Sequence, residues 1–255
     1  MQLRTVQWNI GGSHIREPGA DPTVPDSYVH ADPSYIADTL AQYRPDIVTL
    51  QETHADDAGS QARIISEKLG LPYVINDSYD NSHIDISQKL CQSIVSRFPI
   101  SEHMFSFFLN PHFRKVMEDG SEWVSHDKGV STAVLDIGGA ELVLQTLHLI
   151  PFRKFDVDIL DKAARDVAES VAMRIEKTKS PYLLQGDFNY HDIPAFLPDI
   201  FEHGLHEAGG HAPTTPKGRI YDHVFFRGLT PVADPLVDSN VLTDHYPVVS
   251  EFMHP

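Results

Sequence analysis

The sequence predicts a layered protein of mixed β-strands and α-helices, of the α/β or α+β class. Short apolar runs rich in β-branched residues alternate along the chain with segments whose apolar residues recur at helical spacing. With 255 residues, 41% of them hydrophobic, the chain is long enough to bury a large core without disulfides. Because no repeat, low-complexity tract or long linker divides it, we expect a single domain over residues 1–255.

The first half of the chain is expected to alternate between strands, loops and two helices. Residues 3–8 form an apolar strand, and residues 10–33, rich in Gly, Pro, Asp and Ser, form a long loop. A helix follows, with Asp32 as its cap, Pro33 in its first turn and an apolar stripe, and it ends before Pro45. The remaining elements of this half are a strand at 46–52, a helix at 58–69, an extended segment from 74, a polar loop at 77–88, and strands at 93–97 and 102–108.

The second half begins with an irregular segment at residues 110–128. Strands at 130–137 and 141–148 are expected to form a hairpin across Gly138-Gly139. The longest helix is expected at residues 155–177. The remaining strands are expected at 182–187, 220–226, 232–237 and 248–252.

Polar residues capable of metal and phosphate chemistry stand at the ends of these strands. Such positions favour a site because rigid elements place the side chains that follow them. The set is Asn9, Glu52, His148, Asp187, Asn189, Asp222, Asp244 and His245. Its oxygen-rich character suits Mg²⁺ or Mn²⁺ rather than a thiolate-bound zinc.

Gly186-Asp187-Phe188-Asn189 is the most informative of these motifs. An apolar strand ends in a glycine and then presents a carboxylate and a carboxamide two residues apart. In an extended backbone these two side chains share a face, so one site can receive both. The carboxylate can bind a cation or hold a water, and the carboxamide can hydrogen-bond a phosphate without adding charge.

Taken together, the motifs resemble the endonuclease/exonuclease/phosphatase superfamily, which contains the DNase I-like nucleases. The matching segments are Trp8-Asn9, Leu50-Gln51-Glu52, Thr146-Leu147-His148-Leu149, Gly186-Asp187-Phe188-Asn189, Asp222-His223-Val224-Phe225 and Asp244-His245-Tyr246-Pro247-Val248. Lys128-Gly129 is a lesser match. The resemblance implies a four-layer α/β sandwich with two central mixed β-sheets flanked by helices.

The resemblance also implies a role for each residue. Glu52 would be the main metal ligand, helped by Asn9 and Asp244. Asp187 would orient the attacking water, and Asn189 would contact the phosphate or the leaving group. His148 would contact the scissile phosphate. His245 would be either the base or a charged stabiliser of the transition state, supported by Asp222. The carboxylate that pairs with His148 in DNase I-like enzymes stays open among Asp77, Asp80 and Asp85.

These features predict a metal-dependent phosphodiester hydrolase, a nuclease or phosphodiesterase, in which an activated water attacks phosphorus directly. The alternatives are a phosphomonoesterase acting on a small phosphate ester or phospholipid headgroup and a catalytically silent binding protein. Gly11 stands where abasic-site nucleases of the superfamily carry an acidic residue, and His148 stands where they carry a tyrosine. Both differences point away from that branch.

The charge of the chain restricts the substrate. A net charge of -16 argues against tight binding of long duplex DNA, because neutralising phosphates needs a basic surface. Single-stranded nucleic acid, nucleic-acid ends and small esters are therefore favoured, and the nearest basic cluster is Arg153-Lys154. We expect the segments 13–33 and 110–128 to rim the site and to select the substrate.

The remaining expectations concern the compartment and single residues. The N-terminus lacks the pattern of a secretory signal, and no apolar run is long enough to insert into a membrane, so cytoplasm is expected. Cys91 lies in an apolar strand and is expected to be buried rather than nucleophilic. Trp8 is expected in the core and Trp123 as a loop anchor, while His14, His191 and His223 are expected to be structural.

Overall fold

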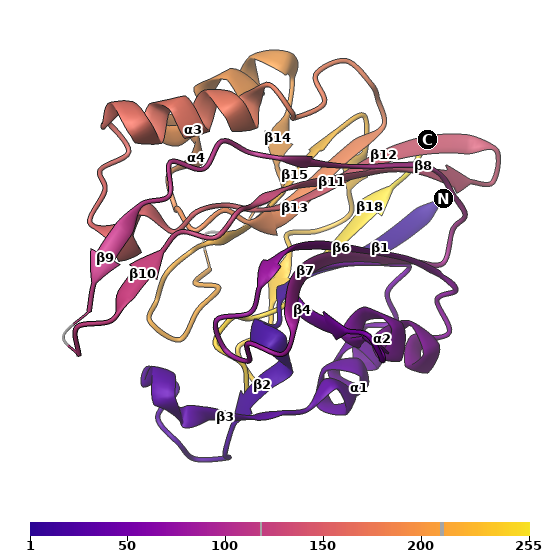
Figure 1. Ribbon diagram of the computed structural model, residues 1–255. Helices are drawn as coiled ribbons and strands as arrows, with labels where there is room; N and C mark the ends of the chain where they lie inside the picture. The colour runs from indigo at the N-terminus through magenta and orange to yellow at the C-terminus, as the bar shows by residue number, and fades with distance from the viewer. Residues whose placement is uncertain (118, 210–211) are drawn as a thin grey trace.

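Two mixed β-sheets packed face to face form the centre of the molecule, with helices on both outer faces (Figure 1). The structure is a computed structural model that describes residues 1–117, 119–209 and 212–255. Apolar cores fill the space between the sheets and the space between each sheet and its helices. The predicted four-layer sandwich is confirmed.

The first sheet has eight strands among the described residues, and it contains the N-terminal strand. Its order is β16 (Thr230–Pro231), β18 (Val248–Met253), β1 (Gln2–Asn9), β4 (Ile47–Asp56), β7 (Lys89–Ser96) and β6 (Tyr73–Asn81), with β17 (Leu236–Val237) on β18 and β5 (Gly59–Ser60) on β4. β1 and β4 are parallel, whereas the other pairs are antiparallel.

The second sheet has six strands in the described part of the chain. Its order is β14 (His206–Glu207), β15 (Asp222–Arg227), β13 (Tyr182–Asp187), β12 (Ala140–His148), β11 (Gly129–Ile137) and β8 (Ile100–Phe107). β12 and β13 are parallel, and β11 and β12 form the predicted hairpin across Gly138-Gly139. Two further hairpins, β2–β3 (His14–Arg16, Tyr28–Ala31) and β9–β10 (Arg114–Val116, Glu122–Val124), lie on the left of Figure 1.

The helices form the two outer layers. α1 (Pro33–Tyr43) and α2 (Gln61–Leu69) cover the first sheet, while α3 (Lys162–Ala172) and α4 (Ile193–Phe196) cover the second. The Asp32 side chain accepts from the Tyr35 amide and caps α1, as predicted. None of the helices in the described segments has the length and apolar character that crossing a bilayer requires.

Short 3-10 turns complete the chain. They are η1 (Gly11–Ser13), η2 (Pro25–Ser27), η3 (Phe152–Phe155) and η4 (Pro198–His203). All four turns lie in the segments that connect strands and helices, so none of them interrupts a strand of the central sheets.

Several predicted elements have other bounds. The helix predicted over residues 155–177 is only α3, because η3 precedes it and the Asp158 and Asp161 side chains bond to nearby backbone amides, which favours a turn over a helix. The polar loop predicted at 77–88 is shorter because β6 continues to Asn81. The loops predicted at 10–33 and 110–128 contain the β2–β3 and β9–β10 hairpins, and the strand predicted at 232–237 is reduced to β17.

Candidate active site

A cavity of about 870 Å³ opens where strands of both sheets end, on the side that carries the β2–β3 and β9–β10 hairpins. It collects most of the predicted site residues: Asn9, Glu52, His148, Asp187, Asn189, Asp244 and His245. Asp222 lies behind His245 and does not line the cavity. Residues of the segments 13–33 and 110–128 line it as well, among them Tyr28 and Trp123.

Strand register brings these residues together. His148 at the end of β12 lies opposite Asp187 at the end of the parallel β13, and Asp187 lies opposite Asp222 at the start of β15. Gly186 is required here because a Cβ at this position would come within 2.2 Å of the Leu147 carbonyl oxygen. The close approach of β12 and β13 therefore explains the glycine that precedes Asp187 in the sequence.

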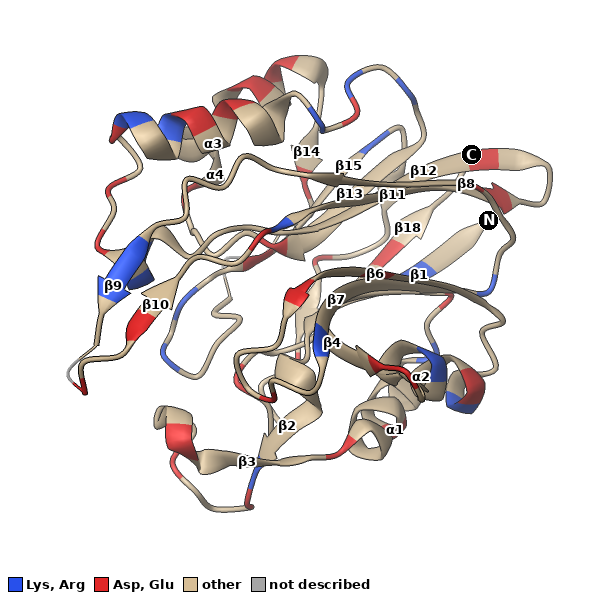
Figure 2. Cartoon of the chain, in the orientation of Figure 1, with Lys and Arg blue, Asp and Glu red and all other residues tan. Residues whose placement is uncertain are grey.

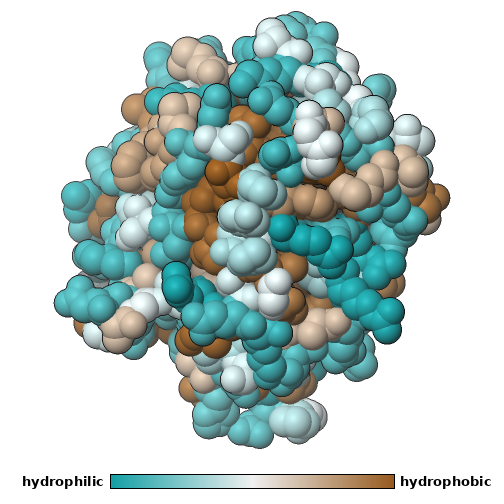
Figure 3. Space-filling view, turned by 90° about the vertical axis from the view of Figure 1, so that its right-hand side faces the viewer, coloured by the Kyte–Doolittle hydropathy of each residue, from teal (hydrophilic) through white to brown (hydrophobic). Residues whose placement is uncertain are grey.

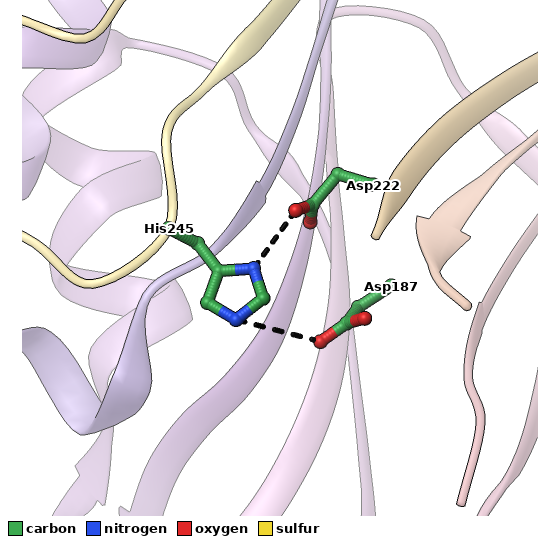
Figure 4. Close-up of side chains that lie close together, drawn as sticks. All are labelled: Asp187, Asp222 and His245. Atoms are coloured by element: carbon green, nitrogen blue, oxygen red, sulfur yellow. Dashed lines mark hydrogen bonds and ion pairs between the residues drawn. The ribbon is translucent and has the colours of Figure 1, made fainter. Parts of the chain in front are cut away.

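Asp222, His245 and Asp187 form the innermost group of the site (Figure 4). Nδ1 of His245 lies 2.8 Å from Oδ2 of Asp222, and Nε2 lies 3.8 Å from Oδ2 of Asp187. The His245 carbonyl accepts hydrogen bonds from the Trp8 indole and the Thr243 hydroxyl. The imidazole is thus held by Asp222 on one nitrogen and presents the other toward the cavity.

Charge inside this group shifts the pKa of both partners. Burial alone would lower the pKa of His245, but Asp222 and Asp187 raise it well above its ordinary value. Burial raises the pKa of Asp187 to about 6, against the opposing charge of His245. At neutral pH the geometry therefore favours an imidazolium at His245 beside a carboxylate poised near its own pKa.

Asp187 and Asn189 meet in a turn rather than on an extended strand. β13 ends at Asp187, and Asn189 has φ 51°, in the left-handed region. Oδ1 of Asp187 accepts from the Asn189 amide at 2.8 Å, and the Asn189 side chain donates to the Leu149 carbonyl at 2.9 Å. The extended geometry predicted for Asp187 and Asn189 is therefore wrong, because the Asp187 side chain accepts from the backbone amide two residues on and the chain bends there.

Glu52 reaches the cavity through a β-bulge. The pairing of β4 with β7 shifts between Leu50 and Thr53, and Glu52 has φ 54°. A non-glycine residue held in this region is uncommon and is seen where a side chain is re-aimed at a site. Burial would raise the pKa of Glu52, but the charges of His148 and then of Lys128 hold this pKa well below its ordinary range.

The partners of His148 differ from those expected. Its ring contacts Nζ of Lys128 at 2.7 Å and the Tyr79 hydroxyl at 3.4 Å, and its Nε2 lies 3.5 Å from Asp187. None of the candidate partners predicted from the sequence contacts it: they are Asp77, bonded to His103, Asp80, bonded to His126, and Asp85, bonded to Ser87. Burial, followed by the charge of Lys128, lowers the pKa of His148 well below its ordinary value.

Several cavity residues were not identified from the sequence as parts of the site. Lys128 is 4% exposed, and burial lowers its pKa to about 8; the Lys128-Gly129 motif was the only signal of it. Trp123 and His14 line the cavity, whereas His223 is buried against Glu207, as expected for a structural residue. The expected burial of Trp8 and Cys91 is confirmed.

Acidic and basic residues occur on elements throughout the chain (Figure 2), and some of the basic ones line the cavity. In a chain with 36 acidic and 20 basic residues, the cavity is lined by four Lys or Arg side chains, Lys128, Lys154, Lys217 and Arg219. Five acidic residues, Asp26, Glu52, Glu122, Asp187 and Asp244, line it as well, so basic residues make up a larger share of the charged residues here than in the chain as a whole. The basic residues come from loops and strand ends that are far apart in the sequence.

The donor set of the cavity fits a hard divalent cation. Glu52 and Asp244 offer carboxylate oxygens, and Oδ1 of Asn9 accepts one hydrogen bond, from the Gly11 amide at 3.0 Å, which leaves a lone pair. Burial raises the pKa of Asp244; the charge of His245 opposes this rise and the charge of Glu52 adds to it. The side chain of Asp244 nevertheless remains open to the cavity. Such crowding of acids favours a bound cation. Among the described residues, the possible ligand atoms that lie within 4.8 Å of one another are those of Asp187, Asp222 and His245. Asp222 and His245 already bond to each other.

A model of the Endonuclease/Exonuclease/phosphatase family matches residues 6–245. The chain belongs to this family. The matched segment thus includes the strand ends that build the cavity, from β1 to the loop that carries His245. No curated protein matches the chain at a significant level.

Solved structures of the family share the fold. A family protein from Beutenbergia cavernae has a TM-score of 0.76 at 19% identity, over 99% of this chain and 72% of its own. The mannosyl-6-phosphatase Bt3783 of Bacteroides thetaiotaomicron has a TM-score of 0.62 at 18% identity, over 98% and 99%. TDP2 from D. rerio, complexed with a single-strand DNA product, has a TM-score of 0.59 at 14% identity, over 99% of both chains. At these identities the likeness concerns the fold alone.

Proposed function

We propose that the protein is a metal-dependent phosphodiester hydrolase. The observation that carries the proposal is the Asp222–His245–Asp187 group, which directs an imidazole and a carboxylate into a cavity that also holds Glu52 and Asp244. Phosphodiester hydrolysis needs a water, a phosphate and a leaving oxygen in line, with charge stabilisation around them. The family match supports the same chemistry.

Glu52, helped by Asp244 and Asn9, would hold Mg²⁺ or Mn²⁺. When bound, the ion would neutralise the phosphate and the developing charge on the leaving oxygen. The bulge that gives Glu52 its left-handed backbone positions its carboxylate for this task.

The protein residues divide the remaining work. Asp187, with a pKa raised to about 6, suits a residue that orients the attacking water and accepts its proton as the new P–O bond forms and the bond to the leaving oxygen breaks. His245, charged by its neighbours, would stabilise the negative transition state rather than act as the base. Asn189 and His148 would contact the phosphate, with Lys128 adding positive charge beside His148.

The first test compares hydrolysis of bis-p-nitrophenyl phosphate with Mn²⁺ by the wild type, His245→Ala and the control His191→Ala, whose residue is exposed outside the cavity. Loss of His245 should lower kcat by about 10²- to 10⁴-fold, and the control should retain wild-type rates. Equal rates in wild type and His245→Ala would contradict the catalytic centre. An inactive wild type would favour the silent binding protein.

The metal is tested without activity. Adding millimolar Mg²⁺ or Mn²⁺ should raise the melting temperature of the wild type. At a hundredfold excess of the ion over its dissociation constant, binding adds about 2.7 kcal/mol to the free energy of unfolding. The shift should shrink in Glu52→Gln, because the variant loses the main carboxylate. No shift in the wild type would refute the metal assignment.

A phosphomonoesterase is the second candidate, and the fold shared with the mannosyl-6-phosphatase supports it. Comparing p-nitrophenyl phosphate with its bis ester separates the two, since a phosphomonoesterase prefers the dianionic monoester. Among diesters, the acidic chain favours single strands, ends or small molecules over gripped duplex. A panel of single-stranded oligonucleotides, plasmid DNA, RNA and sphingomyelin would rank these substrates.

A further inference from the structure

Lys154 occupies a fixed position at the wall of the cavity. It lies in η3, a few residues after β12 ends at His148, and its neighbours Phe152 and Phe155 are buried in the core beneath α3. The turn closes with a hydrogen bond from the Lys154 amide to the Pro151 carbonyl at 2.8 Å. These anchors hold the backbone while the side chain of Lys154 lines the cavity.

The ammonium of Lys154 has no carboxylate partner among the described residues. Nζ lies 5.4 Å from the centroid of the Trp123 ring, which is 38% exposed and packs edge-on against His83. By contrast, Lys115 contacts Asp156 at 2.8 Å and so is neutralised locally. An aromatic face orients a cation without neutralising it, so the charge of Lys154 stays available to a ligand.

Lys154 shares its cavity with the catalytic centre. Its side chain lines the same cavity as Glu52, His148 and His245, so one substrate can reach both Lys154 and these groups. Among the described residues, no ion pair with a predicted metal ligand occupies its ammonium.

Lys217 and Arg219 bring two more cations to the cavity. The turn that holds them is fixed by Thr214, whose hydroxyl accepts from the Tyr221 amide at 3.0 Å. Nη1 of Arg219 donates to the Tyr221 hydroxyl at 3.1 Å, and the guanidinium lies 5.7 Å from the Tyr221 ring centroid. Among the residues that the structure describes, neither cation has a carboxylate within 4.0 Å.

We propose that Lys154, together with Lys217 and Arg219, binds a second phosphate group of the substrate, distinct from the phosphate that is hydrolysed. This inference rests on the proposed phosphodiesterase function. Under the proposed function the scissile phosphate would lie at Glu52, His148 and His245, which would leave these cavity-lining cations for a further anion. An ammonium and a guanidinium are the usual phosphate partners in proteins. Because these cations would bind the second phosphate, the site would select substrates with more than one phosphate.

The test uses two chromogenic substrates that differ only in the second phosphate. These are thymidine 5′-p-nitrophenyl phosphate and its 3′-phosphorylated form. We expect the second phosphate to lower KM by about tenfold in the wild type and expect this preference to vanish in Lys154→Met, which keeps a long side chain against Trp123. The Lys162→Met variant, which removes a charge from the surface of α3, should retain the preference.

Binding without turnover separates failure of this inference from failure of the proposed function. Calorimetry with thymidine 3′,5′-bisphosphate and thymidine 5′-phosphate should show the same loss of preference in Lys154→Met. If neither chromogenic substrate is hydrolysed but the binding preference is present, the proposed function fails and the second phosphate site stands. If the wild type binds both nucleotides equally, or Lys154→Met keeps the wild-type preference, the inference is wrong.

Discussion

The layer between the two sheets has an apolar end and a polar end. Near the chain termini it is filled by side chains such as Leu3, Leu144 and Leu183, and Figure 3 shows a hydrophobic band on this side of the molecule between hydrophilic margins. Toward the cavity the same strands contribute buried polar side chains, and a hydrogen bond of 3.0 Å joins Gln7 to Asp222. Both ends are packed, but by different forces.

Alternation along single strands produces the contrast. In β1 the residues that face the second sheet are Leu3, Thr5, Gln7 and Asn9, and in β13 those that face the first sheet are Leu183, Gln185 and Asp187. Each strand changes from apolar to hydrogen-bonding to site residues along one face. The apolar end supplies stability through burial, whereas the polar end orients Asp222 and Asp187 at the cost of directional bonds that must all be satisfied.

Asp222→Asn should break the polar end most strongly. The substitution keeps the shape but removes the charge that supports His245, so kcat should fall by about 10²- to 10⁴-fold. Losing Asp222 lowers the pKa of His245; if His245 acts as an imidazolium, the alkaline limb of the pH–rate profile moves to lower pH. Movement of the acid limb instead would identify His245 as the base. The exposed Asp199→Asn is the control, and its profile should match the wild type.

Leu144→Ala should affect the apolar end. Leu144 is fully buried between the sheets, so we expect a loss of about 2–5 kcal/mol in the free energy of unfolding. Chemical denaturation measures this change, and kcat/KM at a permissive temperature should stay near wild type. Leu160→Ala, at a 65% exposed position, is the control. A small effect at Leu144 would mean that the apolar end does not supply the stability.

Asp187→Asn should stabilise the metal-free protein while abolishing activity. The pKa of Asp187 is raised by burial to about 6, so its ionised form costs stability. This cost is absent below the unfolded pKa of about 3.9 and complete above pH 6. The variant should gain on the order of 3 kcal/mol at pH 7, and the gain should disappear as the pH falls toward 4. Melting curves with a chelator check this, and a destabilised variant would show that the pair with His245 outweighs burial.

Thr5→Val should have the smallest effect. The Thr5 hydroxyl donates to Oε1 of Gln185 at 2.8 Å, midway between the two ends, and its loss leaves a buried acceptor without this partner. We expect about 1 kcal/mol of destabilisation by denaturation. Thr5→Ser keeps the hydroxyl and should retain most of the hydrogen-bond contribution. If Val were neutral and Ser were destabilising, packing rather than hydrogen bonding would dominate at this position.

The sequence was sufficient to predict the layered fold and to name many of the polar residues that meet at the cavity. Alternating apolar residues identified most of the central strands, and the Asp32 cap and the Gly138-Gly139 turn are local signals that need no tertiary contacts. The strand-end motifs named the residues that the cavity collects. These features depend on neighbours in the chain, so local chemistry was enough to find them.

Other features depend on contacts between residues distant in the chain. The bulge at Glu52 arises from the pairing of β4 with β7, and Lys128 meets His148 across the neighbouring strands β11 and β12. Lys154 appeared in the sequence only as part of a weak basic pair, and packing of Phe152 and Phe155 places it at the cavity. Spacing along the chain does not encode which side chains share a buried, low-dielectric space, and that shared burial is the physical source of the pKa shifts.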